Sequence, residues 1–292
     1  GAAAALYGSR AANGVILITT KRGRAQEGIG VEYNGNFTFD TPSMFPDYQY
    51  QYGAGSNGRK PLTQDEAIEW GRLSFGAPMD GQPVIQFDGV ERPYSPVYVK
   101  DNIKNFYRPS TNWVNTVAFS GGTESVLYRF SLSDLRSQSV VEGSGYNRQT
   151  ANVNLKAFLS DKLSFDTQIQ YNYEKGKNRP GVGYVGTNSA WGVYLIANTV
   201  DIRDLAPGYD PETGQETEWQ HVNQATNPYF ARDRMGNSDT KDRVIAQASL
   251  TYDILPNLFI KGDFMRDFSS WNGEDYYPRG TAFRPLGTYR AL

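Results

Sequence analysis

Cysteine is absent from this 292-residue sequence, and histidine occurs once, at His221. The lack of cysteine excludes disulfide bonds and thiolate metal sites, and it is compatible with an oxidising envelope compartment. His221 lies in a polar loop segment and no Gly-x-Ser-x-Gly elbow occurs, so a serine triad has no support. The net charge of −2 gives no electrostatic reason to expect binding to nucleic acid.

Long hydrophobic runs are also absent. The mean hydropathy is −0.57, and no apolar run reaches the roughly 18 residues that a transmembrane helix needs. A membrane β-barrel stays compatible with this composition, because only every second residue of its strands faces lipid. The sequence has no initial methionine and no signal peptide, so we expect it to be an internal segment of a longer polypeptide.

Alternation of apolar and polar residues is the main secondary-structure signal. The segment 29–40 alternates over about twelve residues, a length that suits a tilted strand crossing a bilayer. Its apolar face consists of Ile29, Val31, Tyr33, Phe37 and Phe39. Six further segments are predicted as strands: 113–120, 125–134, 148–159, 163–173, 243–254 and 258–268.

The connections between these strands alternate in length. Long excursions at about 41–112, 174–240 and 269–292, together with one connection of about ten residues, alternate with tight turns. A membrane barrel has short periplasmic turns and long extracellular loops, whereas a soluble sandwich has no reason to sort its loops by length. Within the first excursion, Thr63 and Glu66 form a capping box that predicts a short helix over 67–73.

The segment 5–23 is the most specific motif. It reads ALYGSRAANGVILITTKRG, in which small residues and an Asn-Gly turn lead into a β-branched strand closed by a basic cluster. This string resembles the end of the plug domain of TonB-dependent outer-membrane transporters, and most closely that of the SusC/RagA branch. The residues that carry the resemblance are Tyr7, Gly8, Ser9, Arg10, Asn13, Gly14, Lys21 and Arg22.

The resemblance implies an all-β fold that is part of a plugged transmembrane antiparallel β-barrel with long extracellular loops. Residues 1–26 would form the C-terminal end of the plug domain, and residues 27–292 the N-terminal portion of the barrel. The strand 15–20, anchored by Lys21 and Arg22 just before the barrel wall, would be the fixed end against which the plug moves.

The same resemblance implies a function without enzymatic activity and without a cofactor. Such transporters import a glycan or peptide fragment, that is, an oligosaccharide or peptide substrate, across the outer membrane of a Gram-negative, Bacteroidota-like bacterium. The implied partners are outer-membrane lipid, a SusD-like surface lipoprotein over the extracellular mouth, and the TonB complex. TonB would act through a segment that precedes residue 1 in the family.

The second long excursion contains candidate binding residues. Sugar and peptide sites combine aromatic faces with hydrogen-bonding side chains, so we expect a substrate cavity to be lined by Tyr184, Asn188, Trp191 and Tyr194. The segment 181–186 matches Gly-x-Gly-x-x-Gly, but it does not follow a buried strand, and the dinucleotide interpretation fails on that context.

Four acidic residues in this excursion could supply oxygen ligands to Ca²⁺: Asp201, Asp204, Asp210 and Glu212. Their spacing is not that of an EF-hand loop, and the sequence from Asp210 to Gly214 is a strong turn signal. Turn formation and solubility therefore explain them first, and no metal site is predicted.

Two alternatives from other classes stay open at this point. One is a structural or adhesive outer-membrane β protein that transports nothing. The other is a soluble carbohydrate-binding β-sandwich, in which the apolar faces of the strands would form the core instead of meeting lipid.

Overall fold

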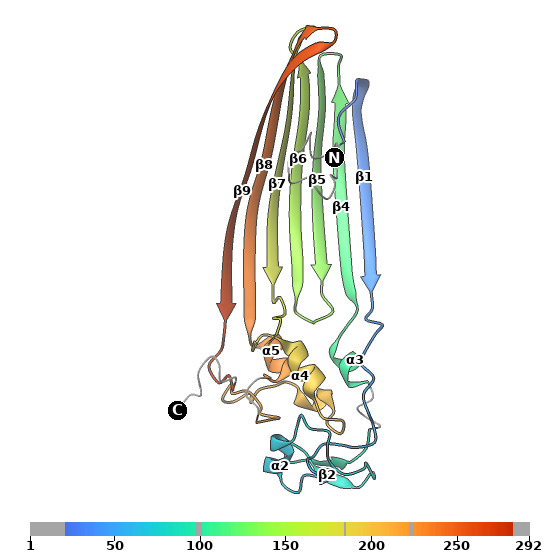
Figure 1. Cartoon of the computed structure of the whole chain (residues 1–292), viewed down its shortest axis with the longest axis vertical. Coiled ribbons are helices and arrows are strands. Elements are labelled where there is room, and N and C mark those ends of the chain that lie inside the picture. The colour runs from blue at the N-terminus through green and yellow to red at the C-terminus, as the bar shows by residue number, and fades with distance from the viewer. Residues whose placement is uncertain (1–20, 97–100, 184, 222–224, 283–292) are drawn as a thin grey trace, which may run out of the picture.

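The structure is a computed structural model that describes residues 21–96, 101–183, 185–221 and 225–282. Its largest part is one antiparallel sheet of seven strands in the order β1-β4-β5-β6-β7-β8-β9 (Figure 1). These strands are β1 (Gln26–Asp40), β4 (Ser110–Gly122), β5 (Val126–Gln138), β6 (Gly145–Phe158), β7 (Leu163–Lys177), β8 (Gly236–Leu255) and β9 (Leu258–Tyr276).

The remaining elements are short and lie in the long loops. Two of them, β2 (Pro83–Ile85) and β3 (Glu91–Pro93), pair as a small antiparallel sheet. The others are α2 (Gln64–Glu69), α3 (Asn102–Phe106), α4 (Ser189–Leu195), the 3₁₀-helix η2 (Ile202–Leu205) and α5 (Pro228–Asp233). None of the helices in the described part of the chain is long and apolar enough to span a membrane.

The pairing register confirms the predicted alternation, because residues opposite one another in an antiparallel pair share a face. One row across the sheet consists of Tyr33, Val117, Leu132, Ala151, Tyr171, Val244 and Phe268. The adjacent row, on the other face, consists of Asn34, Thr116, Ser133, Thr150, Asn172, Arg243 and Ser269. We call the two surfaces the apolar face and the polar face. A slip of one residue in any strand would exchange them.

The apolar face is not covered by a second sheet anywhere in the described residues. Leu132, Val153 and Ile169, from three central strands, are 45%, 42% and 44% exposed. A sandwich would bury these side chains between two sheets about 10 Å apart. The observed arrangement contradicts the sandwich alternative and leaves this face available to a partner outside the chain.

The loops are sorted by length as predicted. The tight turns β4–β5, β6–β7 and β8–β9 lie at one end of the sheet, and the long connections lie at the opposite end (Figure 1). Several predicted boundaries were wrong. β8 begins at Gly236 instead of Arg243, β9 continues to Tyr276 beyond Phe268, and α2 ends at Glu69 instead of Leu73. The strand extensions carry polar residues on both faces, so they give no alternation.

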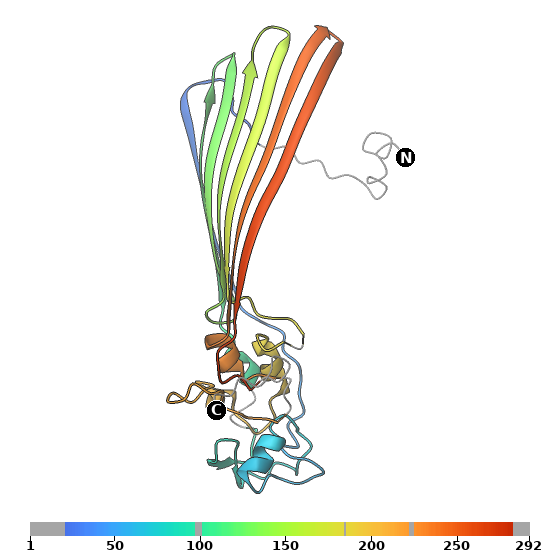
Figure 2. The same cartoon turned by 90° about the vertical axis from the view of Figure 1, so that its left-hand side faces the viewer.

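The long loops pack together into one assembly beyond the end of the sheet (Figure 2). We call this unit the loop assembly; it comprises the described residues of three segments, namely 41–96 with 101–109, 139–144, and 178–183 with 185–221 and 225–235. Its core contains side chains from all three segments, among them Phe106, Val141, Val193 and Trp219, each at most 7% exposed. The capping box forms at α2, where the Thr63 hydroxyl accepts from the Glu66 N–H at 3.2 Å. The loops are thus ordered by a hydrophobic core of their own.

Candidate functional site: the polar face, its anchored basic segment and the apolar band

The apolar face is apolar over only part of its length. From the row of Leu163 and Tyr252 to the row of Tyr171 and Val244 it is dominated by aliphatic and aromatic side chains. Along β7 this distance is about 27 Å at 3.4 Å per residue, or about 21 Å of height for a strand tilted by about 40°. That height is close to the roughly 25 Å of lipid-facing surface on outer-membrane barrels.

The apolar band ends sharply on the side of the loops. The next row on the same face reads Gly35, Asn115, Asp134, Gln149, Tyr173, Asp242 and Ser270. The exception is the β1–β4 edge, where Phe37 and Trp113 make an edge-to-face contact with ring centroids 6.4 Å apart. The sheet therefore carries a band of limited height and continues beyond it as a polar wall.

The polar face carries amides, hydroxyls and charges along its length. Cross-strand hydrogen bonds on this face include Thr116 to Ser133 and Thr150 to Asn172, each 2.9 Å between side-chain oxygens. A hollow of about 380 Å³ lies over it. It is lined by Lys21, Glu32, Asn34, Thr116, Arg129, Ser131, Asn152, Asn154, Gln168 and Gln170. Such a surface suits water and polar solutes better than lipid or a protein core.

The basic segment 21–23 is attached to this polar face at two places. The Lys21 ammonium lies 2.8 Å from one Glu32 oxygen, and the Arg129 guanidinium lies 2.8 Å from the other. The Arg22 guanidinium pairs with Asp166 on β7 at 2.9 Å. Both ends of the Glu32 carboxylate are therefore engaged, and the segment reaches from the first strand of the sheet to the fifth.

Gly23 lies directly on the backbone of β5. A Cβ atom at this position would lie 2.2 Å from the Tyr128 carbonyl oxygen, far inside van der Waals contact. Only glycine permits this approach. Exposed ion pairs contribute about 0–1 kcal/mol each, so close backbone packing is what makes the attachment specific.

The structure describes only part of the predicted signature. Lys21 and Arg22 are described and hold the positions given above, whereas Tyr7, Gly8, Ser9, Arg10, Asn13 and Gly14 lie outside the described residues. Sequence reasoning identified the two cations but missed their partners Glu32, Arg129 and Asp166. The available signal was charge: these residues stand in the polar phase of strands whose other members are mostly neutral.

The predicted cavity residues occupy different positions in the loop assembly. Asn188 precedes α4 and donates to the Gly183 carbonyl at 2.9 Å, and Trp191 packs against the hydrophobic core. Tyr194 is 40% exposed, and its carbonyl accepts from the Tyr48 hydroxyl at 3.3 Å. Tyr184 lies outside the described residues. That these four side chains line a substrate cavity stays a prediction.

A small hollow in the loop assembly includes residues that sequence reasoning did not select as a site. It has a volume of about 40 Å³ and is lined by aromatic and charged side chains that include Tyr48, Tyr50, Asp101 and Lys104. Burial raises the pKa of Tyr48 and Tyr50 above the ordinary tyrosine value. Aromatic faces beside a carboxylate and an ammonium suit a polar solute, although the present volume admits only a few waters.

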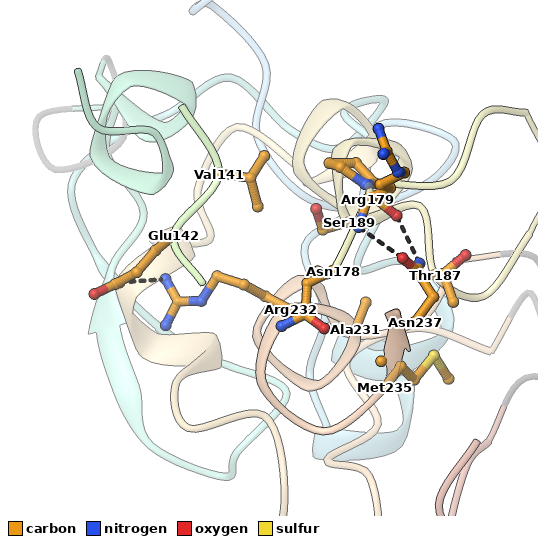
Figure 3. A pocket seen from close by; sticks show the side chains of 12 residues that line it. Val141, Glu142, Asn178, Arg179, Thr187, Ser189, Ala231, Arg232, Met235 and Asn237 are labelled. Carbon is orange, nitrogen blue, oxygen red and sulfur yellow. Dashed lines mark hydrogen bonds and ion pairs between the residues drawn. The ribbon is translucent and has the colours of Figure 1, made fainter. Parts of the chain in front are cut away.

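Side chains at the junction between the sheet and the loop assembly are closely packed and leave almost no free volume (Figure 3). Arg232 on α5 pairs with Glu142 at 3.1 Å, and the Arg179 N–H donates to Asn237 Oδ1 at 2.8 Å. Asn237 in turn donates to the Arg179 carbonyl at 2.8 Å. The space between these groups is about 20 Å³, room for about one water molecule. We interpret these contacts as structural: they connect the loop assembly to the sheet.

A buried carboxylate fastens the segment after β9 to the second long loop. Glu216 accepts from the N–H of Asn227 at 2.6 Å and from the N–H of Ala282 at 2.7 Å. Burial raises the pKa of the Glu216 carboxyl to about 7, although both backbone donors favour the charged form.

Three of the four acidic residues considered for Ca²⁺ have protein partners. Asp201 pairs with Arg203, Asp204 pairs with Arg92, and Asp210 accepts from the backbone N–H of Glu212. No group of three or more His, Asp or Glu side chains in the described ranges is placed to hold a metal ion. These carboxylates therefore serve in ion pairs and turns.

The open sheet, its two unlike faces and its sorted loops define the class. The chain is part of a transmembrane antiparallel β-barrel of the TonB-dependent transporter type. Its fold matches the RagAB peptide transporter with a TM-score of 0.56 at 17% identity, covering 92% of this chain and 31% of that chain. The RagAB peptide importer in its open-open state gives 0.56 at 16% identity, covering 93% and 31%. At these identities the match is evidence of fold.

Sequence comparison supplies the family. No family model matches, but the chain is 30% identical over 225 residues to the TonB-dependent receptor SusC of Bacteroides thetaiotaomicron. It is 32% identical over 175 residues to the TonB-dependent receptor P39 of Formosa agariphila. The matches cover 77% and 60% of this chain but 19% and 15% of the relatives, so the chain spans at most about a fifth of them.

The chain therefore has the sequence and the fold of a segment of a SusC/RagA-type TonB-dependent receptor, as its motif predicted. The sequence relatives are TonB-dependent receptors by name, which confirms the prediction of a protein that is not an enzyme.

Proposed function

We propose that the chain forms part of the wall of an outer-membrane importer for glycan or peptide fragments in a Bacteroidota-like bacterium. The observation that carries this proposal is the pair of unlike faces on one uncovered sheet. An apolar band of bilayer height meets lipid, and the polar face lines a wet interior. The names of the relatives, a TonB-dependent receptor and a peptide importer, support the same class of activity.

In this proposal the substrate enters between the loop assembly and a plug. The loop assembly forms the extracellular rim, where a SusD-like lipoprotein would close over the mouth. Asn188, Trp191 and Tyr194, with Tyr184, are the proposed lining of the outer cavity. Once past the rim, a solute would meet amides and hydroxyls of the polar face, which exchange hydrogen bonds with it as water does.

Residues 1–26 would be the end of the plug, and the basic segment would hold that end to the wall. TonB would pull on the plug from the periplasm, and a pulled domain opens a path only if part of it stays fixed. The contacts of Lys21 with Glu32 and of Arg22 with Asp166 supply that fixed point. Each of these two ion pairs contributes about 0–1 kcal/mol. They therefore fix where the basic segment lies on the wall and add little to its binding free energy.

Uptake by whole cells tests the importer proposal. A strain that lacks the full-length protein should lose growth on one class of oligosaccharide or peptide as sole nutrient. Growth should return with the wild-type gene in a tonB-competent background and fail to return when TonB is absent. Normal growth of the deletion strain on every oligosaccharide and peptide pool would contradict the proposal.

The anchor is tested separately in the full-length protein. Lys21→Ala combined with Arg22→Ala removes both ion pairs, and Arg24→Ala is the matched control, because Arg24 is an exposed cation of the same cluster. We expect the double variant to reach the membrane in normal amount, to import several-fold more slowly, and to be cut faster by protease near residue 24. Uptake and cleavage equal to those of Arg24→Ala would contradict the anchor.

A further inference from the structure

A groove crosses the apolar face at the edge of the apolar band. Its floor is formed by Val117, Leu132 and Ala151 from three adjacent strands, and it is flanked by Tyr33 and Tyr171. Its volume is about 490 Å³, more than that of the hollow over the polar face. The floor is aliphatic, with Leu132 at its centre and the small side chain of Ala151 beside Tyr171. Such a groove accommodates a linear apolar chain better than it accommodates the flat surface of another protein.

The two tyrosines orient the groove. The Tyr33 hydroxyl donates to Asn115 Oδ1 at 2.7 Å, and the Tyr171 hydroxyl donates to Asp242 Oδ1 at 2.5 Å. Both acceptors belong to the polar row that ends the band on the side of the loops. The rings therefore lie in the apolar part with their hydroxyls at its boundary, as aromatic residues do at a membrane interface.

Cations stand above the polar end of the groove. Arg136 and Lys175 lie in one row with Asn147 between them, on three adjacent strands. At about 4.8 Å per strand their Cα atoms are about 10 Å apart, so both side chains can reach one group above Asn147. Asp134 is occupied, because it accepts from Arg136 and from Gln149 at 2.8 Å each. The Arg136 side chain is nevertheless 74% exposed, and Lys175 is exposed as well.

We propose that this groove binds a phosphorylated glycolipid of the outer leaflet, of the lipid A type. One acyl chain lies over Val117, Leu132 and Ala151, and a phosphate lies between Arg136 and Lys175. The inference rests on the proposed function, because it requires that the apolar face meets lipid and that the loop end of the sheet is extracellular. Guanidinium and ammonium groups bind phosphate with charge-assisted hydrogen bonds, and the neighbouring amides of Asn147 and Gln149 suit sugar hydroxyls.

The chemistry selects this lipid over a neutral or zwitterionic one. A phosphatidylethanolamine carries its own ammonium group, which would meet Arg136 and Lys175 with like charge. A glycolipid with a bare phosphate on a sugar offers the anion without that cation and adds hydroxyls for the amides. The groove is also confined to one boundary of the band, so its ligand belongs to one leaflet.

The test uses the full-length protein purified in detergent and titrated with bisphosphorylated lipid A, with binding measured by native mass spectrometry. Phosphatidylethanolamine of matched chain length is the comparison lipid. We expect one lipid A per protein, at least tenfold preferred over the comparison lipid. Arg136→Gln with Lys175→Gln should weaken lipid A binding about tenfold or more, and Ala151→Trp, which fills the floor, should do the same.

Two control variants isolate the groove. Lys241→Gln removes a cation from the polar face, and Ala157→Trp adds the same ring to the same strand and face away from the groove. Both should bind lipid A as the wild type does. Equal binding by all variants, or equal affinity for the two lipids, would overturn the inference. Uptake by the wild-type protein separates the two proposals: a wild-type protein that imports normally but shows no preference for lipid A refutes the groove and leaves the importer standing.

Discussion

An arginine at Ala248 perturbs the apolar face most directly. Ala248 lies on β8 midway between Tyr252 and Val244, which mark the two edges of the apolar band. Arginine on the lipid face of a barrel costs about 2–4 kcal/mol at the bilayer midplane and about 0–1 kcal/mol near the interfaces. We therefore expect Ala248→Arg to lower the free energy of unfolding from a bilayer by about 3 kcal/mol, roughly a hundredfold in the equilibrium constant.

Two controls on the same strand fix the interpretation. Gln247→Arg places the same side chain on the polar face, and Thr240→Arg places it on the apolar side but beyond the band. Each should cost about 1 kcal/mol or less. The assay is urea unfolding of the full-length protein in lipid vesicles, followed by the shift of the folded species on unheated gels. If Gln247→Arg cost as much as Ala248→Arg, or if Ala248→Arg cost less than about 1 kcal/mol, the assignment of this face to lipid would be refuted.

Three further predictions concern the loops and the anchor. Because the folded pKa of Glu216 is about 7, above its ordinary value of 4.5, the folded state holds an extra proton between these values. Stability of the loop assembly should therefore fall as pH rises from 4.5 to 7, by about 3 kcal/mol in all, and Glu216→Gln should abolish this slope in hydrogen-exchange protection. Gly23→Val should push the basic segment off Tyr128 and expose it to protease, whereas Gly262→Ala, with open space around it, should not; equal cleavage would count against the close packing. Thr63→Ala should cost about 1 kcal/mol of local stability at α2, seen as faster amide exchange there, and unchanged exchange would show that the cap contributes nothing.

The strand phases could be predicted from the sequence because lipid on one face and water on the other impose period two on most of the band; Arg266 on β9, opposite Ala246 on the apolar face, is an exception. Ile169 and Ala246, for example, were assigned to the apolar phase of their strands and lie opposite each other on the apolar face. Beyond the lipid that constraint disappears, since water meets both faces. The start of β8 at Gly236 was missed for this reason: Ser238, Thr240 and Asp242 are as polar as the residues between them.

The contacts of the anchor could not be predicted in the same way. Lys21 and Arg22 were recognisable from the motif, but Asp166 is distant in the sequence, and its pairing with Arg22 depends on the curvature and stagger of the whole sheet. The loop assembly shows a similar limit. Trp191 packs on the loop core, and this contact could not be predicted, because burial of a ring depends on which three segments meet there.

The central claim is that successive residues along each strand of the sheet face hydrocarbon and water in turn. The sequence has no cysteine, so single cysteines can be placed at successive positions of β5, from Val126 to Gln138, and spin-labelled in the full-length protein in lipid vesicles. Accessibility to oxygen, which concentrates in hydrocarbon, should peak at every second residue up to Leu132, with the opposite pattern for a water-soluble nickel chelate, and the alternation should cease from Asp134 onward. Uniform accessibility along the strand, or oxygen maxima at Ser131 and Ser133, would contradict the account.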